Sequence, residues 1–226
     1  MSNFEIFLLS SYLVRDSKKI YKTIFFMDLE NLLNNLFIHN ILMYYKIIFF
    51  DIDGVIFKPI NFWVELHKKF GTFEEGKELT EKYLKTDYKK LVEEVVVRLW
   101  KDKDSQPYYD LVNSLEYMQG VKEVFEYVKK KGYLIALISS SSIEVARRVQ
   151  KDYGTDYIFA NELIIKDNKV AGEFIWPVGE GSEEKANIIK DLCTGLEIST
   201  KECIYVGDSE TDIEAFKRVG LSIAFN

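Results

Sequence analysis

Three short, continuous apolar runs constrain the fold of this chain most: residues 46–50, 133–138 and 203–206. Runs of this length without polar alternation are typical of strands that are buried on both faces of a parallel sheet. Amphipathic stretches separate the runs, so strand and helix signals alternate from residue 44 onward. The sequence therefore predicts an α/β fold with a doubly wound parallel sheet.

The segments between these runs follow the same alternation. Apolar side chains recur with helical spacing over residues 121–131, 143–153 and 183–192, which predicts three helices. A short strand at residues 157–159 precedes a hairpin that turns at Asp167 and Asn168. We expect this hairpin to lie at the periphery of the molecule.

Residues 61–118 show helical periodicity throughout, with a break near residues 102–107. We therefore expect a helical insert after the first strand, covering residues 58–118. The remaining parts of the core are residues 44–57 and 119–226.

Residues 1–43 form an N-terminal extension of uncertain status, because Met43, eight positions before Asp51, already provides a possible start. The extension is either a misassigned start or a helical appendage. It contains Asp28 after a short apolar run, an echo of the first strand that lacks the following glycine. We interpret Asp28 as a helix cap.

Composition excludes several classes of protein. The chain has 226 residues, 47% of them hydrophobic, and a formal net charge of −6, the wrong sign for electrostatic binding of nucleic acid. Two cysteines without CxxC spacing and two histidines leave little for a disulfide framework, a zinc site or a Ser-His-Asp triad. No stretch predicts a membrane span or a signal peptide. We expect a cytoplasmic protein without nucleic-acid or membrane partners.

Polar side chains follow at the end of each apolar run: Asp51 with Asp53, then Ser139, then, after Gly207, Asp208. Because ligands bind outside the carboxyl ends of the strands in such sheets, we expect these side chains to converge there. Gly54 permits a tight turn after the two carboxylates. One carboxylate can attack a phosphoryl group while the second moves protons.

An anionic nucleophile that attacks a phosphate needs positive charge and hydrogen-bond donors around it. Lys185 offers an ammonium and Ser139 a hydroxyl. Asp208 and Asp212 offer oxygen ligands that complete a magnesium site with Asp51. Taken singly, each residue has an ordinary explanation as a turn former, a helix cap or a solvated side chain. The joint pattern favours a phosphoryl-transfer site.

These motifs resemble those of the haloacid dehalogenase-like superfamily of phosphotransferases over residues 44–226. The matching segments are FFDIDGV at 49–55, LISSS at 137–141, Lys185 within SEEKANII, and YVGDSETDI at 205–213. Two further segments are similar to the phosphoserine phosphatase branch: YIFANELIIKDNKVAGE at 157–173 and GLSIAF at 220–225. The resemblance implies a Rossmann-like core with a small helical cap, residues 58–118, that closes over the site and selects the substrate.

The resemblance also implies the activity and the roles of the site residues. It implies hydrolysis of a small phosphomonoester through an aspartyl-phosphate, with Asp51 as nucleophile and Asp53 as general acid and base. The residues implied to hold the substrate are Ser139, Ser140 and Lys185. The implied cofactor is Mg²⁺. The residues implied to bind it are Asp51, Asp53 through its backbone carbonyl, and Asp208, with Asp212 either as a further ligand or as a carboxylate that supports one of the ligands.

The chain departs from the branch where the substrate would be selected. Phosphoserine phosphatases hold the amino acid with a Glu after the first motif and an Arg in the cap, but Ile60 and Val95 stand near these positions. Ser140 and Ser141 replace a Gly-Gly pair, and Arg98, one turn from Val95, is the alternative basic residue. Because Ile and Val cannot pair with a zwitterion, we expect a different phosphomonoester. We also expect a shorter or frayed sheet edge after the last strand.

Two alternatives stay open at this point. One is phosphoryl transfer to an alcohol acceptor instead of water, which uses the same motifs. The other is a non-catalytic binding protein built on the same core. Asp51, Asp53 and Asp208 are all present, which favours an enzyme.

Overall fold

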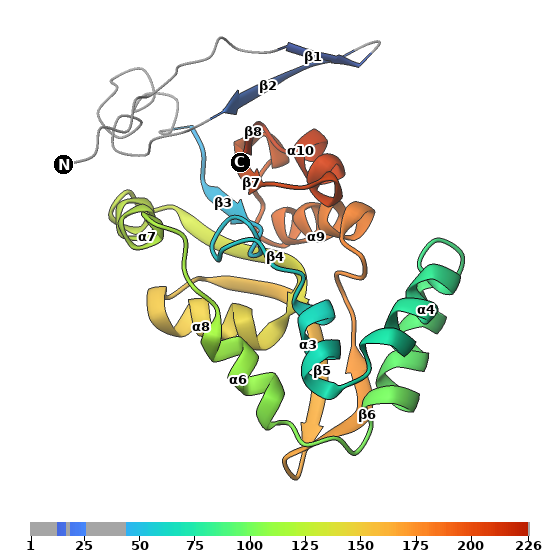
Figure 1. The fold of residues 1–226 in the computed structure, drawn as a ribbon. Coiled ribbons are helices and arrows are strands. Elements are labelled where there is room, and N and C mark those ends of the chain that lie inside the picture. The colour runs from blue at the N-terminus through green and yellow to red at the C-terminus, as the bar shows by residue number, and fades with distance from the viewer. Residues whose placement is uncertain (1–12, 17–18, 26–43, 226) are drawn as a thin grey trace, which may run out of the picture.

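The structure, a computed structural model, describes residues 13–16, 19–25 and 44–225. Within these residues the strands form one sheet in the order β1-β2-β8-β7-β3-β4-β5-β6 (Figure 1). The strands are β1 (Leu13–Asp16), β2 (Lys19–Phe25), β3 (Ile47–Phe50), β4 (Leu134–Ser142), β5 (Tyr157–Lys166), β6 (Lys169–Ile175), β7 (Cys203–Gly207) and β8 (Leu221–Ala224).

Helices occupy the insert and both faces of the sheet. Those of the insert are α3 (Phe62–Phe70), α4 (Phe73–Tyr83), α5 (Tyr88–Glu93), the π-helix η1 (Glu94–Trp100) and α6 (Gln106–Ser114). Those of the core are α7 (Val121–Lys130), α8 (Ile143–Tyr153), α9 (Ser182–Gly195), the short 3₁₀ helices η2 (Thr200–Glu202) and η3 (Glu210–Asp212), and α10 (Ile213–Arg218).

The centre of the sheet is β3, which pairs in parallel with β4 on one side and β7 on the other. All four of its residues are buried, and their side chains alternate between the two faces. Ile48 and Phe50 pack with apolar side chains of α7 and α8, whereas Ile47 and Phe49 pack with those of α9 and α10. The predicted doubly wound α/β fold is confirmed.

Strand β4 is longer than the sequence predicted, because it continues through the serine run to Ser142. Ser139 pairs with Ala160 of β5, and the register then shifts so that Ser142 lies opposite Asn161. Such an irregularity redirects side chains at the end of a strand. The side chain of Ser142 then caps α8 by accepting a hydrogen bond from the Glu144 N–H at 3.2 Å.

The hairpin formed by β5 and β6 turns where the sequence predicted, at Asp167 and Asn168, which both have positive φ. It lies at the edge of the sheet, as predicted, because β6 is the outermost strand. It also contacts the helical insert, which the sequence did not indicate. The Asp102 N–H donates to the Val170 carbonyl, and the Ser105 N–H donates to the Asn168 carbonyl, each at 2.9 Å. The hairpin therefore continues the wall of the helical insert, in hydrogen-bonded contact with the break between η1 and α6.

The described part of the N-terminal extension forms strands rather than a helical appendage. Strands β1 and β2 form an antiparallel pair, and β2 lies parallel to β8 with Ile24 opposite Ile223. The sheet consequently continues beyond β8, so the expectation of a shorter edge is wrong. Asp28, which we interpreted as a helix cap, lies outside the described residues. Among the described residues, no helix has the length and apolar character that crossing a membrane requires.

Candidate active site

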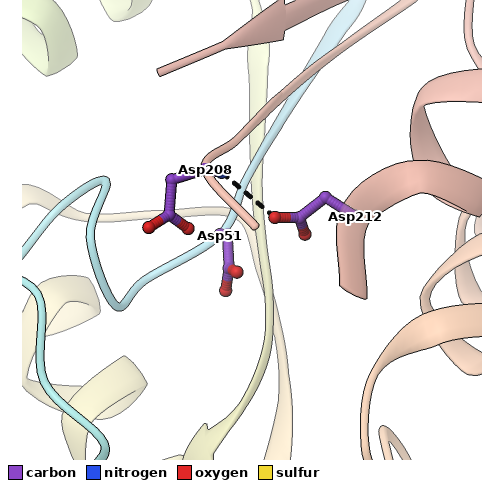
Figure 2. A group of neighbouring side chains, drawn as sticks. All are labelled: Asp51, Asp208 and Asp212. Atoms are coloured by element: carbon purple, nitrogen blue, oxygen red, sulfur yellow. Dashed lines mark hydrogen bonds between the residues drawn. The ribbon is translucent and has the colours of Figure 1, made fainter. Parts of the chain in front are cut away.

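The carboxyl ends of β3, β4 and β7 meet at one edge of the sheet, and each presents a predicted side chain. Asp51 follows β3, Ser139 lies near the end of β4, and Asp208 follows β7. Asp51 and Asp208 lie beside Asp212 (Figure 2). Asp51, Asp53, Ser139 and Asp208 line a cavity of about 450 Å³, whose opposite wall belongs to the helical insert.

Lys185 and Asp51 form a buried ion pair. Lys185 comes from the first turn of α9 and is fully buried, and its Nζ donates to Asp51 Oδ2 and to Asp212 Oδ1 at 2.7 Å each. The other Asp51 oxygen accepts a hydrogen bond from the Ile52 N–H at 2.7 Å. Burial alone would lower the pKa of Lys185, but the two carboxylates outweigh it and hold that pKa above its usual value. Lys185 is thus a fixed cation that touches the predicted nucleophile without lining the cavity.

Asp212 holds the loop that follows β7. Its Oδ1 accepts hydrogen bonds from Lys185 and from the Tyr205 hydroxyl, the latter at 2.6 Å. Its Oδ2 accepts from the backbone N–H of Asp208 at 3.1 Å, drawn in Figure 2, and of Ser209 at 3.0 Å. Burial alone would raise the pKa of Asp212, but the Lys185 charge and these hydrogen bonds hold it below its usual value. Both carboxylate oxygens of Asp212 are therefore already engaged in hydrogen bonds.

Two glycines allow these carboxylates to lie against the backbone. Gly54 has a φ of +77°, and a Cβ at this position would overlap the Asp208 carboxylate. A Cβ on Gly207 would overlap the Asp212 carboxyl group in the same way. The predicted tight turn at Gly54 therefore also makes room for Asp208.

The carboxylates on the cavity side have raised pKa values. Burial, with a contribution from the charge of Asp51, raises the pKa of Asp53 to about 7. Burial, with the charges of Asp51 and Asp212, raises the pKa of Asp208 to about 6. A carboxyl group with a pKa near neutral can both donate and accept a proton under physiological conditions.

The acidic cluster fits the predicted divalent cation. One oxygen each from Asp51, Asp208 and Asp212 lies within 4.8 Å of the other two. An all-oxygen donor set suits a hard cation such as Mg²⁺. Among the described residues, the ammonium of Lys185 pairs with Asp51 and Asp212 but not with Asp208. The cluster therefore carries excess negative charge that a divalent cation would balance.

Two side chains that the sequence did not single out hold the serine run at the end of β4. The backbone carbonyl of Ser140 accepts hydrogen bonds from Trp63 Nε1 at 2.8 Å and from Asn161 Nδ2 at 2.9 Å. Asn161 is fully buried and also accepts from the N–H groups of Val178 and Gly179 at 3.2 Å each. Asn161 therefore links β5 with the loop before α9, and Trp63 links the insert with the core.

The insert contributes an apolar wall at the positions where the branch places charged residues. Ile60 and Val95 both line the cavity. Arg98 does not reach it, since Arg98 Nε donates to Glu94 Oε2 at 2.6 Å and the Arg98 side chain is 55% exposed. The π-helix buries Val95 and turns Arg98 outward, so the alternative basic residue lies outside the cavity.

Comparison with known proteins agrees with this geometry. The family described as haloacid dehalogenase-like hydrolase matches residues 45–220. A phosphoserine phosphatase from Archaeoglobus fulgidus is 30% identical over 183 residues, 80% of this chain and 52% of that protein, so the chain spans about half its length. One from Methanocaldococcus jannaschii is 29% identical over 184 residues, 80% of this chain and 85% of that protein. A solved structure described as a phospho-aspartyl intermediate analogue of phosphoserine phosphatase has a TM-score of 0.67 and 28% identity, and the match covers 80% of this chain and 86% of that chain.

The sheet, the aspartates at its strand ends and the helical insert define a hydrolase with an acidic active site. The chain belongs to the haloacid dehalogenase-like hydrolases. Within this family its similarity is to the phosphoserine phosphatase branch, as the motifs predicted. The predicted enzyme class, a phosphoric monoester hydrolase, agrees with these relatives.

Proposed function

We propose that the protein is a magnesium-dependent phosphatase that hydrolyses a small phosphomonoester through an aspartyl-phosphate on Asp51. The arrangement at the end of β3 carries this proposal. Asp51 contacts the fixed ammonium of Lys185 at 2.7 Å, and Asp53, two residues away, has a pKa of about 7. The chemistry needs a positioned carboxylate nucleophile and a neighbour that holds a proton near neutral pH.

In the first step, a carboxylate oxygen of Asp51 forms a bond to phosphorus while the bond from phosphorus to the ester oxygen breaks. Asp53 gives its proton to the departing oxygen, so the product leaves as a neutral alcohol. In the second step, Asp53 takes a proton from a water molecule whose oxygen attacks the same phosphorus. The acyl-phosphate bond breaks, and inorganic phosphate and the free Asp51 carboxylate are regenerated.

We assign Mg²⁺ to Asp51, the backbone carbonyl of Asp53, and Asp208, with Asp212 supporting the loop behind them. When bound, the cation supplies positive charge to the phosphoryl oxygens. Asp212 accepts hydrogen bonds from four neighbouring residues and fixes the backbone of Asp208, which supports this division of roles.

In this proposal the hydroxyls of Ser139 and Ser140 hold the phosphate, and Lys185, behind Asp51, stabilises it through its charge. Ser139 and Ser140 both line the cavity. The carbonyl of Ser140 is fixed by Trp63 and Asn161. A strand end held in this way needs little rearrangement to present donors to a phosphate.

Residues 58–118 act as a cap over the core of residues 44–57 and 119–226. The cavity lies between the two parts, and the hydrogen bond from Trp63 crosses their junction. A cap in this position excludes water while the phosphoryl group is transferred. We place the enzyme in a reducing, cytoplasmic setting, because two cysteines without CxxC spacing do not make a disulfide framework.

The substitution Asp51→Asn tests the proposal, because it removes the nucleophile and leaves the shape of the side chain almost unchanged. We expect turnover to be abolished, measured as phosphate released from a panel of phosphate esters with Mg²⁺. Asp191→Asn, on the exposed side of α9, is the matched control and should behave as wild type. Activity of Asp51→Asn within a factor of about ten of wild type would show that the nucleophile is wrong. Adding glycerol and measuring glycerol phosphate separates hydrolysis from transfer to an alcohol.

A further inference from the structure

The wall of the cavity that faces the reacting groups is apolar and aromatic. Indole rings from two separate parts of the chain lie together there, with the centroids of Trp63 and Trp176 4.7 Å apart and those of Trp63 and Trp100 6.1 Å apart. The other side chains that complete this surface, referred to below as the apolar wall, are Ile60, Leu91, Val92, Val95 and Val96.

Among the described residues that line the cavity, none is a lysine or an arginine. His67 lies in the wall, bonded through Nδ1 to the Thr72 hydroxyl at 2.8 Å. Burial lowers the pKa of His67 to about 4, so it is uncharged at neutral pH. Outside the catalytic motifs, the lining contains one carboxylate, that of the exposed Glu180. The wall therefore offers no positive charge to the organic part of a substrate.

This composition decides which organic groups the cavity accepts. An ionised group that loses its water without gaining a partner is strongly disfavoured in an apolar site. A substrate carboxylate beside Ile60 and Val95 would find no cation among the described lining residues, and Glu180 would repel it. Flat apolar groups, in contrast, gain contact with the indole rings.

The wall is fixed relative to the site of phosphate transfer. Trp63 packs against two other indoles and donates from Nε1 to the Ser140 carbonyl. Trp176 donates from Nε1 to the Tyr88 hydroxyl at 3.1 Å. These bonds hold the rings in place before a ligand binds, so the apolar wall is a preformed surface.

We propose that the substrate is a phosphomonoester whose organic part is uncharged and largely apolar, packed against the apolar wall, with Trp63, Trp176 and Val95 as specificity-determining residues. The inference rests on the proposed function, and it adds the substrate class. A volume of about 450 Å³ falls within the range of small-molecule pockets and accommodates an aryl or branched alkyl group beside the phosphate.

The test compares esters that differ in one group. Benzyl phosphate and 4-carboxybenzyl phosphate have leaving alcohols of similar reactivity, because a methylene separates the ring from the ester oxygen. We expect kcat/KM for benzyl phosphate to exceed that for 4-carboxybenzyl phosphate and for phosphoserine by at least about a hundredfold. Equal or higher efficiency with either carboxylate-bearing ester would overturn the inference. So would phosphocholine as the best substrate, which would show that the wall selects a cation.

Two variants on η1 test whether the preference for the uncharged ester arises at the apolar wall. Val95→Arg places a guanidinium in the apolar wall and should raise efficiency for 4-carboxybenzyl phosphate while lowering it for benzyl phosphate. Val97→Arg adds the same group to an exposed position, 47% exposed and outside the cavity, and should leave both unchanged. A preference that shifts equally in the two variants would contradict the assignment to the wall. Because Val95 is buried and its variant can fail to fold, the wild-type comparison decides the matter independently.

Binding separates this inference from the proposed function. Benzylphosphonate and 4-carboxybenzylphosphonate cannot be hydrolysed, and their binding with Mg²⁺ present is followed through tryptophan fluorescence, since three indoles line the cavity. Tight binding of benzylphosphonate alone, with no phosphate released from any ester, would retain the inference and defeat the proposed function. Preferred binding of the carboxylated analogue would overturn the inference even if the enzyme is active.

Discussion

Replacing Lys185 with methionine removes the only cation that the described structure places against Asp51 and Asp212. Methionine keeps the length and the apolar stem of the side chain. The exposed fractions of the side chains are 0% for Lys185, 0% for Asp212 and 7% for Asp51, so water cannot take over the role of the ammonium. Breaking a buried ion pair by removing one partner costs about 3–5 kcal/mol. Because two carboxylates lose the same partner, we expect the upper part of that range, about 4–5 kcal/mol.

Urea unfolding near neutral pH without divalent cations, followed by tryptophan fluorescence, measures this loss. With an m-value of about 2 kcal/mol per molar urea, the midpoint should fall by roughly 2 M. Lys190→Met is the matched control, because Lys190 lies on the exposed side of the same helix. The control should change the free energy of unfolding by less than about 0.5 kcal/mol.

The pH dependence of the Lys185→Met effect provides a second check. In the wild type, Lys185 holds the pKa of Asp212 below its usual value, so this stabilisation is present at neutral pH and is lost on strong acidification. In the variant, both carboxylates are buried without a cation, which raises their folded-state pKa values above the unfolded ones. Protonation of these carboxylates removes the unpaired buried charges as the pH falls. The deficit of the variant in free energy of unfolding, relative to the wild type, should therefore shrink toward about pH 5. A deficit below about 1 kcal/mol at neutral pH, or one that grows on acidification, would refute the reasoning.

Three further predictions concern activity and the N-terminal extension. Asp53→Asn should lower kcat by about 10²–10⁴-fold. The kcat/KM of the wild type should fall as the pH rises through about 7, where Asp53 loses its proton. A pH profile that the substitution leaves unchanged would contradict the acid role of Asp53. Phosphate release should stop in EDTA, return with Mg²⁺ and be inhibited by Ca²⁺, which prefers more and longer oxygen contacts; full activity in EDTA would argue against the metal assignment. Deleting residues 1–42 should leave kcat/KM unchanged, since every motif lies beyond them. It should lower the melting temperature, because β8 loses its hydrogen-bonded neighbour β2. An inactive truncated protein would show that the extension is needed to hold the active site.

The strand ends were predictable because two local signals coincide there. An apolar run fixes each core strand, and the polar residue that ends the run falls at the carboxyl edge of the sheet. Asp51, Ser139 and Asp208 were placed correctly on that basis. The extension of β4 through the serine run was missed, because pairing with β5 rather than apolar character decides it.

Contacts between distant segments account for most of what the sequence did not predict. Asn161 lies within a segment that carried the resemblance, yet nothing local indicates that it binds the backbone of Ser140 and Gly179. The hairpin lies at the sheet edge as predicted, but its own pattern does not reveal the carbonyls it offers to residues 102–105. The π-helix that turns Arg98 outward likewise has no sequence signal of its own, so only the structure shows that the apolar wall lacks this cation.

The phosphorylated enzyme offers the most direct measurement of the mechanism. Acid quenching during turnover of benzyl phosphate that carries a radiolabelled phosphoryl group, followed by digestion and peptide mapping, shows which residue receives that group. The mechanism predicts label on the peptide that contains Asp51, sensitive to hydroxylamine as an acyl phosphate, and no label in Asp51→Asn. Label on a different residue, or full turnover by Asp51→Asn, would contradict it.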